Sequence, residues 1–126
     1  IIRDQVARSR ISGSDTQVAL QKQLVIAEKI KEAVVNGKVI QLLSLLDESY
    51  KLKKQYSPYI ANEFVDQTES SLQSLGAKGI KLSGAGGGGH MFCFFPDGVP
   101  NLTNEKLPEF VKLIPCAFEE RSIHEL

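Results

Sequence analysis

The sequence predicts an α+β domain in which helices pack on one face of a small, mainly antiparallel sheet. Helical periodicity dominates the residues before Gly76, whereas the residues after it form short apolar and aromatic runs separated by glycine and proline. This division is typical of an α+β layer architecture. The 126 residues, 42% of them apolar, contain no repeat and no long linker, which suits a single domain with its own core.

The first long helix is expected to begin at Ser14 or Asp15, which are both favourable N-caps, and to end at Asn36 and Gly37. The residues before it are polar and broken by Gly13, so only "IIRDQVA" at the start could form one or two helical turns. The apolar residues that recur at helical spacing in the long helix are Val18, Leu24, Val25, Ile30, Ala33 and Val34.

A second helix is expected at Val39–Tyr56, because Pro58 prevents its continuation. The short link before it makes the first two long helices antiparallel neighbours. A third helix is expected at Asn62–Leu75, where Gly76 ends the pattern. The residues expected to face the core are Val39, Leu42, Leu43, Leu46, Tyr50 and Leu52 in the second helix, and Phe64, Val65, Thr68, Leu72 and Leu75 in the third.

Three strands are expected after the helices. They are Ile80–Leu82 within "KGIKLS", Met91–Phe95 within "HMFCFF" and Cys116–Glu119 within "IPCAFEE". A turn is expected at "PDG", residues 96–98. A short helix is expected at Glu105–Leu113, although a proline interrupts its start.

Charge and composition argue against several classes of function. Fifteen basic and fifteen acidic residues give a net charge of zero, and without a basic run we expect no non-specific binding to nucleic acid or to an anionic membrane. No apolar run is long enough to span a membrane and no signal-like leader opens the chain, so we expect a soluble, cytoplasmic protein. Cys93 and Cys116 are expected to be reduced core thiols and not metal ligands. Because the chain begins with Ile1 and not with Met, we expect it to be a piece of a longer protein.

The stretch "KLSGAGGGGHMFCFF" carries the clearest functional signal. Gly84, Gly86 and Gly89 satisfy G-x-G-x-x-G, but a dinucleotide site needs a helix after the glycines and here an aromatic strand follows. A Walker loop also fails, because "HM" stands where lysine and serine or threonine are required. What remains is a strand-loop-strand with bare backbone N–H groups, fit for an anion or for another loop. The alternative is a flexible turn without a ligand, although a hairpin turn needs only one or two glycines.

This stretch and its surroundings resemble a known family. "KLSGAGGGGHMFCFF" is similar to the third conserved motif of the GHMP kinases, named for galactokinase and for homoserine, mevalonate and phosphomevalonate kinases. "LKKQYSPYI", "LGAKGIKLSGAGGGGHMF" and "IPCAFEERSI" resemble the C-terminal part of the D-glycero-D-manno-heptose 7-phosphate kinase branch. "IIRDQ" resembles the helix that follows the Ser-Arg segment of that branch. The resemblance covers most of the chain.

The resemblance implies that residues 1–126 form the C-terminal, ferredoxin-like domain of a two-domain enzyme. Such an enzyme transfers the γ-phosphoryl group of ATP to a hydroxyl of a sugar or sugar phosphate. The nucleotide loop, catalytic carboxylate and catalytic lysine of the family lie in the N-terminal domain, and nothing here resembles them. We therefore expect ATP and Mg²⁺ to bind mainly to that absent domain. No catalytic or metal-binding residue is expected here, and this piece alone is expected to be inactive.

The resemblance also assigns the expected ligand-binding positions. Ser83 precedes the glycines with a hydroxyl that could donate to phosphate or substrate, and the backbone at Gly87 is expected to face phosphate. His90 departs from the family, which commonly has an apolar or small residue there, and local packing or hydrogen bonding is favoured over catalysis. The positions that match the motif are Gly84, Ala85, Gly86, Gly87, Gly88 and Gly89.

Two alternatives stay open. A non-enzymatic module that holds an anionic metabolite at the glycine loop, and so regulates a partner, fits the composition equally well. Lysines 51, 53 and 54 favour a solvated helix end, with binding of a sugar phosphate as the alternative. Asp47 and Glu48 are expected on a solvated helix surface.

Overall fold

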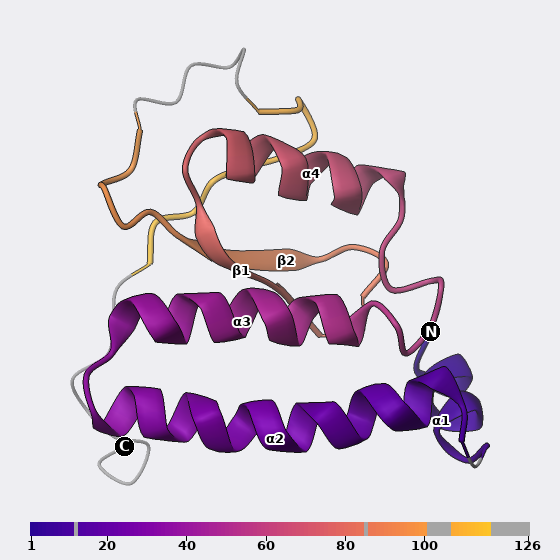
Figure 1. Ribbon diagram of the computed structural model, residues 1–126. Helices are drawn as coiled ribbons and strands as arrows, with labels where there is room; N and C mark the ends of the chain where they lie inside the picture. The colour runs from indigo at the N-terminus through magenta and orange to yellow at the C-terminus, as the bar shows by residue number, and fades with distance from the viewer. Residues whose placement is uncertain (12, 85, 101–106, 117–126) are drawn as a thin grey trace, which may run out of the picture.

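The computed structural model describes residues 1–11, 13–84, 86–100 and 107–116 (Figure 1). It confirms the α+β class predicted from the sequence. Within these residues the elements are α1 (Ile2–Ser9), α2 (Asp15–Val35), α3 (Val39–Lys53), α4 (Glu63–Ser74), β1 (Lys78–Ser83) and β2 (His90–Phe94).

The helix boundaries follow from capping chemistry. Ser14 caps α2 by accepting a hydrogen bond from the N–H of Gln17 at 3.1 Å, and Gly37 lies beyond its end with a φ of 64°. Asn62 caps α4 in the same way, with the N–H of Val65 at 3.0 Å. Helix α3 ends at Lys53, three residues before the predicted Tyr56, and a turn leads into Pro58. The remaining predicted ends are confirmed to within one or two residues.

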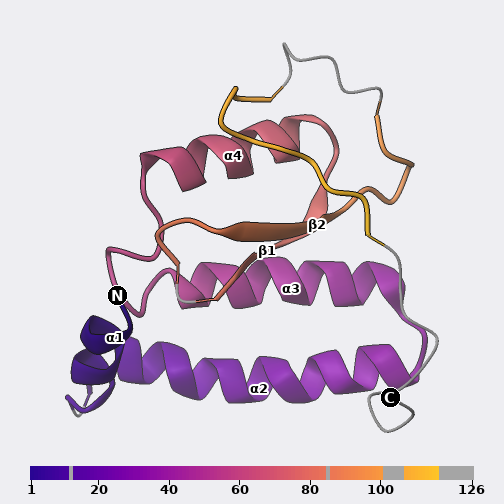
Figure 2. The same cartoon turned by 180° about the vertical axis from the view of Figure 1, so that it is seen from behind.

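Helices α2 and α3 run antiparallel as neighbours, and α4 lies on the other side of α3 (Figures 1 and 2). Strands β1 and β2 pair antiparallel, with Leu82 opposite Met91 and Ser83 opposite His90. Alternate residues of β1, Ile80 and Leu82, lie in the core, so one face of the sheet receives both α3 and α4. Helices α3 and α4 thus cover this face, and the turn from β1 to β2 emerges where α3 ends and α4 begins.

Two alanines and one isoleucine of α2 carry its contact with α3. Ala19, Ile26 and Ala33 recur every seven residues along α2 and pack with Leu45 and Leu52 of α3. The predicted apolar face of α2 is therefore only partly right, because it included Ala33 and Ile30 but missed Ala19 and Ile26. Four of the predicted residues are exposed in the structure: Val18, Leu24, Val25 and Val34.

Three further expectations are corrected. Residues 107–113 contain a turn but no helix, because Pro108 lacks an N–H group, and its carbonyl accepts one from Val111 at 2.9 Å. Cys116 is an exposed free thiol and not a core residue, whereas Cys93 is a partly buried free thiol. Cys116 is not in a strand, and the rest of the predicted strand Cys116–Glu119 lies outside the described residues, as do positions 105–106 of the predicted helix.

A fourth correction concerns Asp47, whose carboxylate fixes the sheet from within the protein. Its two carboxylate oxygens accept hydrogen bonds from the N–H groups of Gly79 and Ile80, at 3.1 and 2.8 Å. Glu48 is exposed, as expected. Helix α3 is thereby fixed to the start of β1. In the part of the chain that is described, no helix is long and apolar enough to cross a membrane.

Candidate functional site

The glycine loop, defined here as residues 83–89, connects β1 to β2 beside the first turn of α4. Ser83 and His90 close the ladder at its base, and both are exposed. The five glycines of the loop all have positive φ angles, from 77° at Gly87 to 149° at Gly88. Residues with a side chain rarely adopt such angles, so the loop conformation itself requires glycine. Ala85, which the sequence also placed in the site, lies outside the described residues.

Gly86 and Gly87 form the packed half of the loop. A β-carbon on Gly86 would lie 2.7 Å from the Cα of Ile60 and 2.9 Å from its carbonyl oxygen. The N–H of Gly87 donates to the same carbonyl at 2.6 Å, and a β-carbon there would lie 2.5 Å from Cδ1 of Ile1. The loop is therefore pressed against the segment between α3 and α4.

Gly84, Gly88 and Gly89 form the open half. A β-carbon on any of the three would meet no atom within 4 Å. All three glycines are exposed. The N–H of Gly87, which was expected to face phosphate, is bound to the carbonyl of Ile60 in this structure. The open positions are Gly84, Gly88 and Gly89.

Lys53 holds the loop from the end of α3. Its Nζ donates to the carbonyl oxygen of Leu82 at 3.3 Å and also to that of Gly84. Burial, followed by repulsion from the nearby Lys81, lowers the pKa of Lys53. The ammonium group of Lys53 lies at the base of the glycine loop. From the sequence, Lys53 was expected either in solvent at the helix end or in contact with a sugar phosphate. In the structure it binds backbone carbonyls instead.

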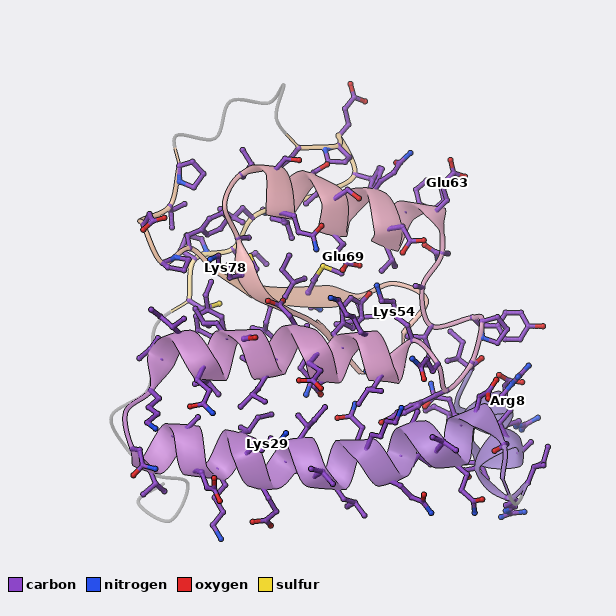
Figure 3. The ribbon with its side chains drawn as sticks, in the orientation of Figure 1. Arg8, Lys29, Lys54, Glu63, Glu69 and Lys78 are labelled. Carbon is purple, nitrogen blue, oxygen red and sulfur yellow. The ribbon has the colours of Figure 1, made fainter. Side chains whose placement is uncertain are left out.

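The other two lysines of this helix end point elsewhere. Lys51 is exposed. Lys54 turns toward α4, where its Nζ lies 3.0 Å from a carboxylate oxygen of Glu69 and 4.6 Å from the ring centre of Tyr50 (Figure 3). Of the three, the described contacts bring only Lys53 to the loop.

Asn62 also contacts the loop, which the sequence analysis missed. Besides capping α4, its side-chain nitrogen donates to the carbonyl oxygen of Gly87 at 3.0 Å. From the sequence Asn62 was visible only as a helix start, because a contact between residues 25 positions apart leaves no local pattern.

Helix α1 lies beside the same segment. The side chain of Ser57, which is 2% exposed, donates a hydrogen bond that lowers the pKa of Asp4, and the neighbouring Arg8 lowers it further. Arg8 and Asp4 form an ion pair at 3.1 Å (Figure 3). Together with the contact between Ile1 and Gly87, these interactions place α1 against the packed half of the loop.

The loop offers backbone groups and few side chains to a ligand. In the described ranges, no group of three His, Cys, Asp or Glu residues could hold a metal ion. An open hollow of about 700 Å³ exists at the other end of α3, lined by Lys38, Val39, Ile40, Gln41, Ser44 and Leu45. Its lining is mostly apolar, and it shares no residue with the glycine loop. The chemistry available at the loop is therefore hydrogen bonding by glycine N–H groups next to a lysine charge.

Comparison with known proteins places most of the chain, including the glycine loop, in one family. Residues 30–112, more than half of the chain and including the whole glycine loop, match the family described as GHMP kinases C terminal. Over 79 residues the chain is 34% identical to a bifunctional fucokinase/GDP-fucose pyrophosphorylase of Arabidopsis thaliana. This alignment covers 63% of the chain but only 7% of that protein. No solved structure matches the chain.

Proposed function

Since the chain belongs to the GHMP kinases, matching their C-terminal part, we propose that residues 1–126 are the C-terminal domain of an ATP-dependent sugar kinase. The proposed enzyme transfers the γ-phosphoryl group of ATP to a hydroxyl of a sugar or sugar phosphate. The nucleotide-binding domain and the catalytic groups belong to an N-terminal domain outside this sequence.

The observation that carries this proposal is the open half of the glycine loop. Phosphoryl transfer depends on positioning and on electrostatic stabilisation of the phosphate oxygens. Gly84, Gly88 and Gly89 present backbone without side chains, and Lys53 adds a positive charge at the base of the loop. This arrangement supports contact with a nucleotide or sugar phosphate that the N-terminal domain holds from the other side.

The proposed acceptor is a sugar, and two candidates come from resemblance. The Arabidopsis relative is named as a fucokinase, and the sequence motifs resemble the heptose 7-phosphate kinase branch. The described residues offer no cluster for a metal ion, so we propose that Mg²⁺ is held mainly by the N-terminal domain together with ATP. A cytoplasmic location, where ATP is supplied, accompanies the proposal.

The direct test is a phosphoryl-transfer assay on the full-length protein that carries this domain. ADP release would be measured with ATP and Mg²⁺ against a panel containing fucose, other free sugars and sugar 7-phosphates. We expect turnover with at least one of these acceptors. Binding of ATP or a sugar phosphate without any transfer would instead support the regulatory module, and the kinase proposal would fall.

The chain offers a matched pair of variants for the loop. Gly89 and Gly98 share a φ of 94°, and at both positions a β-carbon would meet open space. Changing either to alanine thus introduces the same kind of backbone strain, in the loop or outside it. We expect Gly89→Ala to lower kcat/KM by about a hundredfold, because a strained backbone would turn an N–H donor away from the phosphate and the loss of one transition-state donor typically costs that much, and Gly98→Ala to leave it unchanged. Equal activities of the two variants would remove the loop from the site.

A further inference from the structure

The side chain of Asn62 has two partners on different elements. Its Oδ1 accepts the N–H of Val65 and so caps α4, while its Nδ2 donates to the carbonyl oxygen of Gly87, both at 3.0 Å. If the amide were flipped, its NH₂ group would face the N–H of Val65 and its oxygen would face the carbonyl of Gly87, and neither pair can form a hydrogen bond. The two contacts therefore fix the orientation of the amide. The start of α4 and the glycine loop are therefore joined through one residue.

The two peptide groups on either side of Gly87 are each held by a hydrogen bond. The N–H of Gly87 points at the carbonyl of Ile60, and the carbonyl of Gly87 points at Asn62. Because the peptide between Gly87 and Gly88 is trans, its N–H and carbonyl point in opposite directions. The N–H of Gly88 consequently points away from Asn62, and Gly88 is exposed with open space beside its Cα.

We infer that Asn62 is a positioning residue, which orients the N–H of Gly88 as a donor to a phosphate group of the nucleotide or sugar phosphate. This inference rests on the proposed kinase function and deepens it. A freely turning glycine peptide would lose orientational freedom on binding phosphate, whereas a peptide already held by Asn62 loses little. Preorientation of this kind is what makes a backbone donor effective at a developing charge.

The two contacts of Asn62 can be separated by substitution. Asn62→Ser keeps a favourable N-cap for α4 but is too short to reach the carbonyl of Gly87. Asn62→Ala loses both contacts. In the full-length protein we expect the serine variant to melt close to the wild type and the alanine variant to melt several degrees lower. Both should lose about tenfold in kcat/KM, measured below their melting temperatures, with KM for the sugar acceptor unchanged.

Ser14→Ala is the matched control, because the Ser14 hydroxyl caps α2 and donates to the carbonyl of Arg8, and neither contact involves a residue of the glycine loop. It should lower the melting temperature as Asn62→Ala does and leave kcat/KM at the wild-type value. If Asn62→Ser keeps wild-type kcat/KM in an active kinase, Asn62 is only a helix cap, and the inference is overturned while the kinase function stands.

A second readout does not depend on activity. Backbone ¹⁵N relaxation of the labelled full-length protein reports the order parameter of the Gly88 N–H. We expect a value near that of rigid backbone, about 0.85, in the wild type and one below about 0.6 in Asn62→Ser. An unchanged order parameter would overturn the positioning role. If the wild type transfers no phosphoryl group, the proposed function fails, yet this measurement still decides whether Asn62 orients Gly88.

Discussion

Gly86 and Gly89 lie three residues apart in one loop, yet a methyl group would meet the backbone of Ile60 at the first and open space at the second. The packed half of the loop needs glycine because another part of the chain lies against it. The open half needs glycine for its backbone angles and leaves room for a ligand. A run of glycines can thus satisfy two separate demands, and only the three-dimensional contacts tell which residue serves which.

The largest expected change in stability comes from a substitution in the packed half of the loop. Gly86→Ala adds a β-carbon within 3 Å of the Ile60 backbone at a φ of 106°. Overpacking costs about 1–3 kcal/mol and the unfavourable backbone angle about 1–2 kcal/mol, so we expect the free energy of unfolding to fall by about 2–5 kcal/mol. Gly84→Ala, with a φ of 84° and no such contact, should lose only the strain. Urea denaturation of both variants measures the difference, and equal losses would mean that the two halves are not distinct.

Lys53→Met tests the charge at the base of the open half. Methionine keeps an unbranched apolar side chain but removes the ammonium group from the carbonyls of Leu82 and Gly84. We expect about a tenfold loss of kcat/KM, the equivalent of about 1.4 kcal/mol, and faster amide exchange in residues 84–89. Lys54→Met is the control, because Lys54 pairs with Glu69 and not with the loop. If the two variants behave alike, Lys53 has no special role at the glycine loop.

The smallest effect concerns the layer beneath the packed half, where Tyr50 packs with Ile60 and Leu82. The Tyr50 hydroxyl is buried and, among the described residues, has no hydrogen-bond partner. Burial, with the nearby charges of Glu69 and Asp66, raises its pKa from 10.0 to about 12. The folded state therefore keeps the proton that the unfolded state loses, and stability should decline as pH rises from about 10 to about 12.

Tyr50→Phe should weaken this alkaline decline. At neutral pH the variant should change the free energy of unfolding by less than about 1 kcal/mol, because the lost hydroxyl forms no hydrogen bond. Thermal melts of both proteins between pH 7 and pH 11 provide the comparison. A steep alkaline decline that persists in Tyr50→Phe would assign the titration to another group.

The parts of the fold that sequence alone predicted are those with local causes. Ser14, Asn62 and Gly37 mark helix ends through capping and turn chemistry, and the strands on either side of the glycines follow from short apolar runs. The parts that were wrong depend on contacts between distant residues. Asp47 was read as solvated, but it accepts N–H groups from residues more than 30 positions away.

Contacts between distant residues also decide which side of a helix is buried and which residues reach the candidate site. In α2 the buried stripe is Ala19, Ile26 and Ala33, and only Ala33 was predicted. Apolar residues also lie on other sides of this helix, so helical spacing alone placed the exposed Leu24 and Val25 in the core. In the loop the motif predicted a turn between two strands, as observed, but it could not show that Gly87 is bound to Ile60. Nor could it bring Lys53 and Asn62 to the loop, since both arrive from other elements.

The division of the loop can be tested most directly by following the glycine amides of the ¹⁵N-labelled full-length protein during titration with ATP and Mg²⁺. The N–H of Gly87 already donates to Ile60, whereas Gly88 and Gly89 lie in the open half. We predict large chemical-shift changes for Gly88 and Gly89 at saturating ATP and a much smaller change for Gly87. Changes that are largest at Gly87, or absent from all three amides while ATP binds, would contradict the account.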